Sequence, residues 1–295
     1  MPPNDPVPIR FVDLNVRDLD RSLDFYTRHL ELTVIATPHR DDAERWLDAG
    51  PTVLRLHHRP DGTAPGWVAD DLQRGFRHLG FGVANVDERV EALHEAKVPF
   101  HLEPLDADGG VRISFFYDPD GVLLEFIEGN LHYHRVWDDE LAVRLQARPA
   151  PPRPTFDHVA LTASDQAKTI EFYRSALGYR VSGQLFQTGD PRGFEITYLH
   201  AGDTVLELFT FRAPTLTSPW NAAETTIGFR HVGFVDDGPV RTIAEGESAA
   251  EHQEAAAGDI AARLTSRGAT VVGAAACVLL DPDGLALRIE SGSEG

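Results

Sequence analysis

Cysteine, lysine and methionine are nearly missing from this chain of 295 residues, which has one cysteine, one methionine and only two lysines. A single cysteine excludes a disulfide within the chain, and the place of Cys277 in the apolar run 274–280 predicts a small core residue rather than a nucleophile. No run of about 20 apolar residues occurs, so the sequence predicts no membrane-spanning helix. The first residues lack the basic and apolar stretches of a signal peptide, and we expect a cytoplasmic protein.

Positive charge is also scarce. The chain has 27 Lys and Arg against 46 Asp and Glu, which gives a formal net charge of -19 at pH 7. Binding to phosphate groups needs clustered Lys and Arg, so this balance argues against nucleic acid and anionic membrane surfaces as partners. The length leaves room for about two domains of ordinary size.

What the chain does have is self-similarity, because one pattern occurs four times. The two clearest copies begin the two halves of the sequence, and a weaker copy follows each of them. The four copies are Phe11–Val16 with Asp18 and Phe25-Tyr26, Gly75-Phe76-Arg77-His78, His158–Ala163 with Asp165 and Phe172-Tyr173, and Gly228-Phe229-Arg230-His231. An internal repeat of this kind determines the architecture before individual propensities are considered.

Each copy predicts one βαβββ unit. In the first copy a strand over 9–16 precedes a helix over 19–30, and strands follow near 32–37, 44–48 and 52–57. In the second and fourth copies an Asp-Pro-Asp-Gly turn leads into the last strand, since Pro and Gly suit tight turns. These turns are Asp118-Pro119-Asp120-Gly121 and Asp281-Pro282-Asp283-Gly284. The fourth copy also holds an insertion rich in Glu, Ala and Gly, residues 238–258, which predicts a mobile acidic loop.

A proline-rich segment, residues 148–154, separates the two halves. Proline lacks the backbone donor that helices and inner strands need, so we interpret 133–154 as a linker that is Pro-rich at its end. The predicted domains are 7–132 and 155–292, each with two βαβββ modules.

These motifs resemble the vicinal oxygen chelate superfamily, which includes glyoxalase I, methylmalonyl-CoA epimerase, extradiol dioxygenases, and the fosfomycin and bleomycin resistance proteins. The most specific are Asp157-His158-Val159, with Phe172-Tyr173 fourteen residues on, and the two Asp-Pro-Asp-Gly turns. The resemblance covers nearly the whole chain. It implies an α+β fold in which four βαβββ modules pair into two cup-shaped domains, with a divalent metal on the floor of a cup. Each module can supply one ligand from its first strand and one from its last.

The four copies differ at these ligand positions. In chain order, the first strands offer Phe11, His78, His158 and His231, and the last strands offer Arg55, Glu125, Glu207 and Arg288. Neutral imidazole and carboxylate suit Zn, Ni, Mn, Co or Fe(II). Phenylalanine cannot coordinate a metal, and a guanidinium repels one. Only the second and third modules therefore hold complete ligand pairs.

Two pairings of the modules are open. If modules pair in sequence order, the second domain offers a three-ligand site of His158, Glu207 and His231. If the second module pairs with the third, one cup holds His78, Glu125, His158 and Glu207, which is the four-ligand set of glyoxalase I and methylmalonyl-CoA epimerase. We favour the second pairing, because it brings all the intact ligands together.

The resemblance implies a small-molecule substrate or ligand and a monomer or homodimer. The leading hypothesis is a metal-dependent lyase or isomerase that acts on a small vicinal-oxygen substrate through a metal-bound enediolate. Glu125 would be the catalytic base, with Glu207 as ligand or second base. Alternatives are an Fe(II) extradiol-type dioxygenase using His78, His158 and Glu125, and a bleomycin-resistance-like binding protein without catalysis. For the glutamates, a structural ion pair with a neighbouring arginine is the competing hypothesis.

Overall fold

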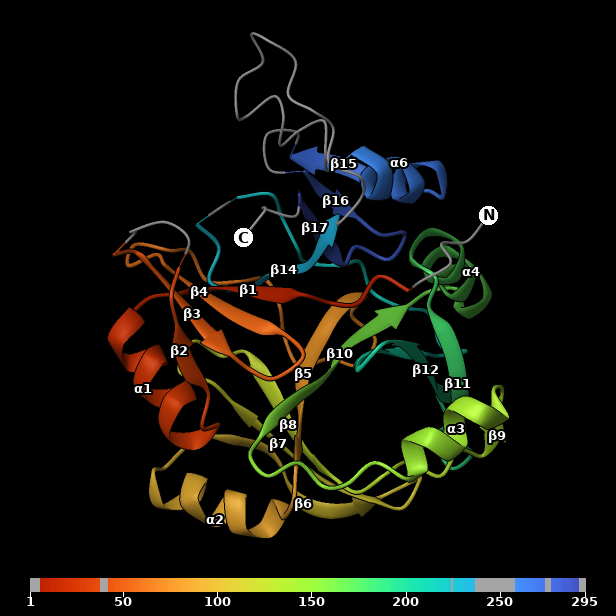
Figure 1. Ribbon diagram of the computed structural model, residues 1–295, viewed down its shortest axis with the longest axis horizontal. Coiled ribbons are helices and arrows are strands. Elements are labelled where there is room, and N and C mark those ends of the chain that lie inside the picture. The colour runs from red at the N-terminus through yellow and green to blue at the C-terminus, as the bar shows by residue number, and fades with distance from the viewer. Residues whose placement is uncertain (1–5, 38–41, 224, 237–257, 274–276, 292–295) are drawn as a thin grey trace, which may run out of the picture.

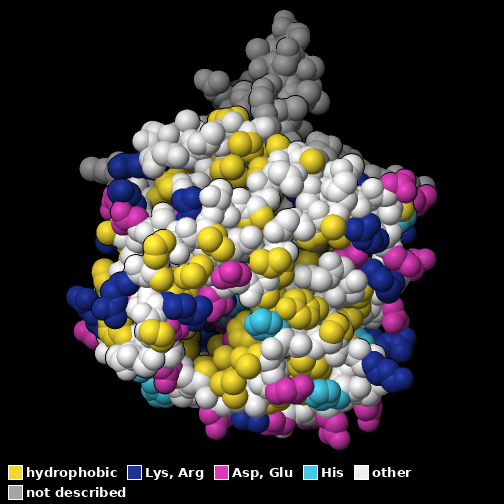
Figure 2. All heavy atoms as spheres, turned by 180° about the vertical axis from the view of Figure 1, so that it is seen from behind, with side chains coloured by type: hydrophobic (Ala, Val, Ile, Leu, Met, Phe, Trp, Pro, Cys, Tyr) yellow, Lys and Arg dark blue, Asp and Glu magenta, His cyan; other side chains and the backbone are white. Residues whose placement is uncertain are grey.

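The computed structural model describes residues 6–37, 42–223, 225–236, 258–273 and 277–291. Strands dominate it, and the helices lie on the outside of the sheets (Figure 1). No helix in these ranges is both long enough and apolar enough to span a membrane. On the face drawn in Figure 2, acidic and basic side chains are interspersed and form no continuous basic surface.

The first half contains two βαβββ modules. The first is β1 (Phe11–Val16), α1 (Leu19–His29), β2 (Thr33–Ile35), β3 (Glu44–Asp48) and β4 (Val53–His58). The second is β5 (Gly75–Val83), α2 (Val86–Glu95), β6 (Phe100–Ala107), β7 (Val111–Tyr117) and β8 (Leu123–Glu128). Within the predicted linker, the chain forms β9 (Arg135–Val136) and α3 (Asp139–Gln146) before its Pro-rich end.

The second half repeats the same order of elements. The third module is β10 (Thr155–Ala163), α4 (Gln166–Leu177), β11 (Arg180–Gln187), β12 (Phe194–Ala201) and β13 (Thr204–Thr210). The fourth is β14 (Gly228–Asp236), α6 (Gly258–Ser266), β15 (Thr270–Gly273), β16 (Val278–Leu280) and β17 (Ala286–Ser291). The predicted α+β fold of four βαβββ modules is confirmed. Residues 238–257 of the predicted acidic loop lie outside the described residues.

The modules combine out of sequence order. One sheet has the strand order β15-β16-β17-β14-β1-β4-β3-β2, and the other has β6-β7-β8-β5-β10-β13-β12-β11-β9. Antiparallel pairing of β1 with β14 joins the first and fourth modules, and that of β5 with β10 joins the second and third. Pairing in sequence order is therefore wrong, and the ranges 7–132 and 155–292 each contribute strands to both sheets.

Consecutive modules are connected differently, through the motifs that the repeats share. The hydroxyl of Tyr26 on α1 donates to Asp118 in the second module over 2.9 Å, and that of Tyr173 on α4 donates to Asp281 in the fourth over 2.7 Å. All four side chains are buried. Each Phe-Tyr motif thus fixes a helix to the Asp-Pro-Asp-Gly turn of the following module.

Candidate metal centre

The four predicted ligands come from four adjacent strands. His78 lies on β5, Glu125 on β8, His158 on β10 and Glu207 on β13, and these strands are neighbours in the order β8-β5-β10-β13. Side chains alternate between the two faces of a strand. The apolar neighbours of the ligands belong to the main core, among them Leu79, Leu124, Phe126, Val159, Leu206 and Leu208. The same alternation turns the four polar side chains to the opposite face, where they meet.

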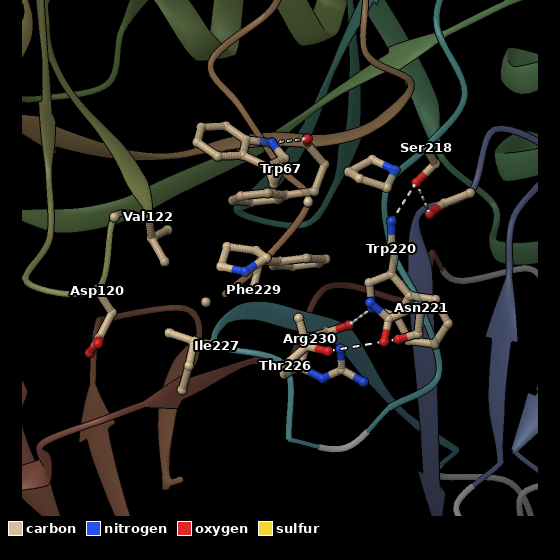
Figure 3. A pocket seen from close by; sticks show the side chains of 17 residues that line it. Trp67, Asp120, Val122, Ser218, Trp220, Asn221, Thr226, Ile227, Phe229 and Arg230 are labelled. Atoms are coloured by element: carbon tan, nitrogen blue, oxygen red, sulfur yellow. Dashed lines mark hydrogen bonds between the residues drawn. The ribbon is translucent and has the colours of Figure 1, made fainter. Parts of the chain in front are cut away.

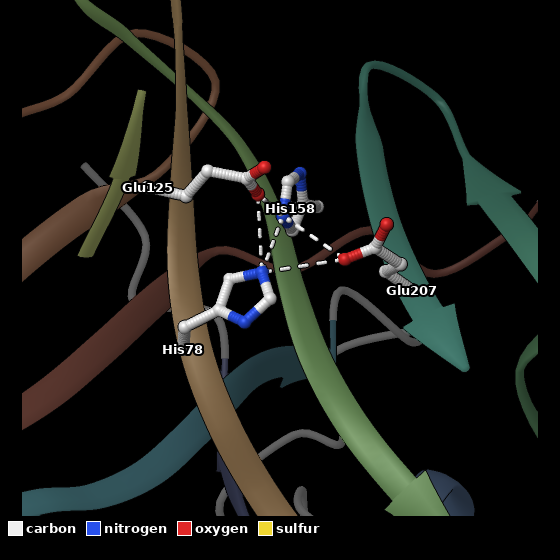
Figure 4. Close-up of side chains that lie close together, drawn as sticks. All are labelled: His78, Glu125, His158 and Glu207. Carbon is white, nitrogen blue, oxygen red and sulfur yellow. Dashed lines mark hydrogen bonds and ion pairs between the residues drawn. The ribbon is translucent and has the colours of Figure 1, made fainter. Parts of the chain in front are cut away.

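The four side chains point toward one another (Figure 4). The Nε2 atoms of His78 and His158 are 3.0 Å apart. Glu125 Oε2 lies 3.1 Å from the first nitrogen and 2.9 Å from the second. Glu207 Oε2 lies 3.3 Å from both. One nitrogen or oxygen from each side chain lies within 4.8 Å of the other three, and all four residues are buried.

This donor set fits one divalent ion. Imidazole nitrogen and carboxylate oxygen bind zinc at about 2.0–2.2 Å, which places neighbouring ligand atoms about 3 Å from each other. The two imidazole nitrogens, 3.0 Å apart, have this spacing. Glu207 Oε2 is buried and makes no hydrogen bond, although the two imidazole nitrogens lie 3.3 Å away. An unsatisfied buried carboxylate oxygen costs free energy that a cation would recover.

Electrostatics keep the Glu125 carboxylate ionised. Burial opposes the charged form of Glu125, but hydrogen bonds from His158 and His78 lower its pKa to about 2. Burial likewise opposes the charged form of His158, but attraction by Glu207 and hydrogen bonds to Asp157 and Glu125 raise its pKa well above the ordinary value. Without a cation, a proton on this imidazole balances part of the negative charge. Metal binding must therefore displace a proton.

Two supporting residues were not predicted as part of the site. Asp157 Oδ2 lies 2.9 Å from Nδ1 of His158, and a carboxylate at that distance fixes the tautomer and orientation of a ligand histidine. Tyr198 on β12 lies across from Glu207 on β13 and hydrogen-bonds to it. Burial and this neighbouring carboxylate raise the pKa of Tyr198 well above its ordinary value, so it stays a neutral donor. The position of Asp157 next to His158 in the sequence could have suggested its supporting role, whereas nothing in the sequence suggests that of Tyr198.

A cavity of about 280 Å³ adjoins the ligands. Glu125 and Glu207 are part of its wall, and most of the remaining lining is apolar, including Ile113, Phe115 and Phe209. A site of this kind admits a small organic molecule and excludes much of the water around it.

The other sheet brings together the positions that cannot hold a metal. Arg55 donates to both carboxylate oxygens of Glu290 at 2.8 and 3.0 Å and lies over the ring of Phe11 at 3.4 Å. Arg288 lies 3.1 Å from the same Glu290 carboxylate. Both arginines are thus engaged in internal ion pairs.

His231 also belongs to this other sheet. It lies on β14, and its Nδ1 is 3.2 Å from Asp13 Oδ2. The alternative three-ligand site of His158, Glu207 and His231 is therefore not formed, because β14 pairs with β1 and not with β10.

A smaller cavity of about 40 Å³ lies between corresponding segments of the second and fourth modules (Figure 3). The rings of Phe76 and Phe229 are stacked there, with centroids 4.0 Å apart. The indoles of Trp67 and Trp220 donate to the backbone oxygens of Phe76 and Arg230 at 2.9 and 2.8 Å. We interpret this cavity as a packing feature, since the tryptophan donors are already satisfied.

Comparison with known proteins identifies the family. Residues 9–126 and 155–289 match the model of the Glyoxalase/Bleomycin resistance protein/Dioxygenase superfamily, so the chain belongs to this superfamily, as the repeat motifs predicted. Over 127 residues it is 32% identical to the uncharacterized protein YwkD of Bacillus subtilis, a match covering 41% of this chain and 95% of YwkD.

Two further relatives bear on function and fold. The chain is 28% identical over 174 residues to a lactoylglutathione lyase of Arabidopsis thaliana, a match covering 56% of this chain and only 53% of the plant protein. The crystal structure of glyoxalase I from Zea mays has the same fold, with a TM-score of 0.61 and 19% identity over 96% of this chain and 92% of the maize chain.

Proposed function

We propose that this protein is a metal-dependent lyase or isomerase that acts on a small substrate with two neighbouring oxygen atoms. One observation carries the proposal: two imidazoles and two carboxylates converge beside a largely apolar cavity, and one buried carboxylate oxygen has no hydrogen-bond partner. The similarity to a lactoylglutathione lyase supports the same class of reaction.

The residues of the site have distinct roles in this proposal. His78, Glu125, His158 and Glu207 would hold the ion, which supplies Lewis-acid polarisation of the two substrate oxygens. Glu125 is the proposed base, because it lines the cavity and is ionised at neutral pH. Its carboxylate takes a proton from the carbon that bears one oxygen and returns it to the neighbouring carbon, so that no net oxidation occurs. Tyr198 holds Glu207, which is the candidate second base.

An Fe(II) dioxygenase is the second candidate. His78, His158 and Glu125 lie within 2.9–3.1 Å of one another and form the two-histidine, one-carboxylate set of such enzymes. The fourth candidate ligand, Glu207, favours the isomerase, since it occupies a position that oxygen chemistry needs open. Oxygen consumption by the Fe(II)-loaded protein with catechols would reverse this preference.

Metal analysis tests the proposal first. We expect about one Ni, Zn, Co or Mn ion per chain after loading and desalting, and almost none in His158→Ala. The matched control is His231→Ala, which removes a buried histidine of the other sheet and should leave the metal content unchanged. Absence of bound metal in the wild-type protein, even at millimolar supply, would overturn the proposal.

The activity assay follows on the loaded protein. A panel of 2-hydroxy ketones and thiol adducts of 2-oxoaldehydes, with the glutathione adduct that is isomeric with lactoylglutathione included, should show hydrogen transfer between adjacent carbons. We expect Glu125→Gln to lower kcat by about 100-fold or more, as for loss of a general base.

A further inference from the structure

Among the residues that the structure describes, Arg77 is the only arginine or lysine that lines the cavity beside the candidate metal centre. It shares this cavity with Glu125 and Glu207, the two carboxylates of the centre. A substrate bound to the centre therefore lies in the same cavity as one cationic side chain.

Arg77 is held in a fixed position. Its Nη2 donates to Asp71 Oδ1 over 2.6 Å, and its guanidinium carbon lies 4.3 Å from the ring centroid of Phe209. The other oxygen of Asp71 is 3.0 Å from Nη1 of Arg192. Arg192 therefore holds the carboxylate that in turn holds Arg77. Only 12% of the Arg77 side chain is exposed. A guanidinium held in this way has lost most of its conformational entropy before a ligand arrives.

The guanidinium still has bonding capacity. It carries five N–H groups, and the described contact with Asp71 uses one of its nitrogens. The Nε atom is buried and has no hydrogen-bond partner. A buried donor without a partner costs free energy, which an oxygen of a ligand in the cavity would recover.

The corresponding arginine of the fourth module is used differently. Arg230 occupies the same position in the repeat, one residue before His231. Its Nη1 donates to the backbone oxygen of Asn221 over 3.2 Å, and its guanidinium lies 5.0 Å from the ring of Trp220. Figure 3 shows Arg230 beside Trp220 and Asn221, which lie in the loop before β14. Arg230 thus fastens a loop, whereas Arg77 lines the cavity of the cup that holds the four ligands.

We propose that Arg77 binds a carboxylate of the substrate whose two neighbouring oxygens occupy the metal centre. This inference rests on the proposed function and narrows its substrate class to small 2-oxo or 2-hydroxy compounds that carry a second, anionic end. A planar carboxylate matches the guanidinium fork in geometry and charge.

Matched hydroxamates test the inference, because the hydroxamate group presents two neighbouring oxygens to a metal. The three probes are glutaric acid monohydroxamate, pentanohydroxamate and 5-aminopentanohydroxamate, which end in a carboxylate, a methyl and an ammonium group. We expect the Ni-loaded wild-type protein to bind the carboxylate probe at least about tenfold more tightly than the methyl probe in calorimetry, and the ammonium probe least tightly.

Variants assign this preference to Arg77. Arg77→Gln should reduce the preference for the carboxylate to less than threefold, and Arg77→Lys should retain part of it. Arg230→Gln is the control, because Arg230 is the corresponding arginine of the fourth module and does not line the cavity. It should keep the wild-type preference.

The outcomes separate the inference from the function on which it rests. If all three probes bind the loaded protein equally, the metal centre stands and the role of Arg77 is overturned. Preference for the ammonium probe overturns it as well and assigns selectivity to the aspartates that line the same cavity, Asp70, Asp71 and Asp108. If no hydroxamate binds, the proposed function fails and the inference fails with it.

Discussion

At the scale of single residues, a glycine helps to set the position of His158, one of the four candidate ligands. Gly80 on β5 lies opposite His158 on β10, and a Cβ atom built on Gly80 would lie only 2.0 Å from the imidazole ring. The equivalent pair in the other sheet repeats this, since a Cβ on Gly233 would lie 2.0 Å from the ring of Phe11. In both sheets the ring crosses over the glycine of the neighbouring strand.

We predict that Gly80→Ala displaces His158 and lowers metal affinity at least tenfold. The added methyl group cannot fit without moving the ring, and such overpacking costs about 1–3 kcal/mol of stability. Gly82→Ala on the same strand is the matched control, because its nearest neighbour would be 3.6 Å away. Metal titration and urea unfolding of both variants check this. Wild-type affinity in Gly80→Ala would show that the ring position does not matter.

The sequence predicted which four side chains lie together, but not the residues that support them. Comparison of the repeats was sufficient to choose His78, Glu125, His158 and Glu207, because each module carries its own ligand pair at fixed positions. Gly80 and Tyr198 could not be recognised, since their roles depend on strand register and packing across the cup. The register of β5 against β10 joins residues about 80 positions apart, and no local pattern encodes it.

At the scale of elements, each Asp-Pro-Asp-Gly turn binds a helix of the preceding module through a tyrosine–aspartate hydrogen bond. Asp118 Oδ1 accepts from the backbone N–H groups of Asp120 and Val122, while its Oδ2 accepts from Tyr26. Asp281 is arranged in the same way toward Asp283, Leu285 and Tyr173. Burial, opposed by these hydrogen bonds, raises the pKa of Asp118 to about 6. Burial and the nearby Asp283 raise that of Asp281 to about 7.

These pKa values predict a loss of stability as pH rises. In the unfolded chain Asp281 ionises near pH 3.8, whereas in the native protein it keeps its proton to about pH 7. Unfolding between these values releases a proton, so the contribution of Asp281 is largest at low pH and is lost as pH rises toward about 7. The change is about 1.4 kcal/mol for each pH unit in this window.

To check this prediction, the free energy of unfolding of the wild-type protein and of Asp281→Asn is measured in urea at several pH values. The difference in unfolding free energy, wild type minus variant, should decrease from pH 5.5 to about 7 and stay constant above that. Asp118→Asn is the internal control, for which the difference should level off near pH 6. A difference that is flat or rises over this range would contradict the prediction. The sequence predicted both turns. It did not predict their hydrogen bonds with the tyrosines of the Phe-Tyr motifs, which the structure shows.

At the scale of the whole molecule, the four modules form a closed set of contacts. The sheets join the first module to the fourth and the second to the third, whereas the tyrosine–aspartate contacts join the first to the second and the third to the fourth. The repeat predicted the modules and the fold class from the sequence. It left the pairing open, since each module presents the same kind of edge strand and only the distribution of ligands distinguished the schemes.

We therefore predict that neither half of the chain forms a native monomer alone. Cleavage of the gene between Pro149 and Ala150, both exposed, gives one half with His78 and Glu125 and another with His158 and Glu207. Each half alone leaves one edge of β1 and of β5, or of β10 and of β14, without its partner strand, and unpaired edges of this kind promote aggregation. Co-expressed halves should assemble one to one and bind one metal ion per pair.

The experiment must distinguish the one-to-one assembly of the two halves from a dimer of two first halves. Two copies joined through β5 would bring together two His78 and two Glu125 side chains and could also bind a metal. The variant His158→Ala in the second half separates the cases: it abolishes metal binding by the mixed assembly but cannot affect a dimer of first halves. A first half that is monomeric, folded by circular dichroism and able to bind metal alone would contradict the shared centre, because its ligands would then come from one half of the chain.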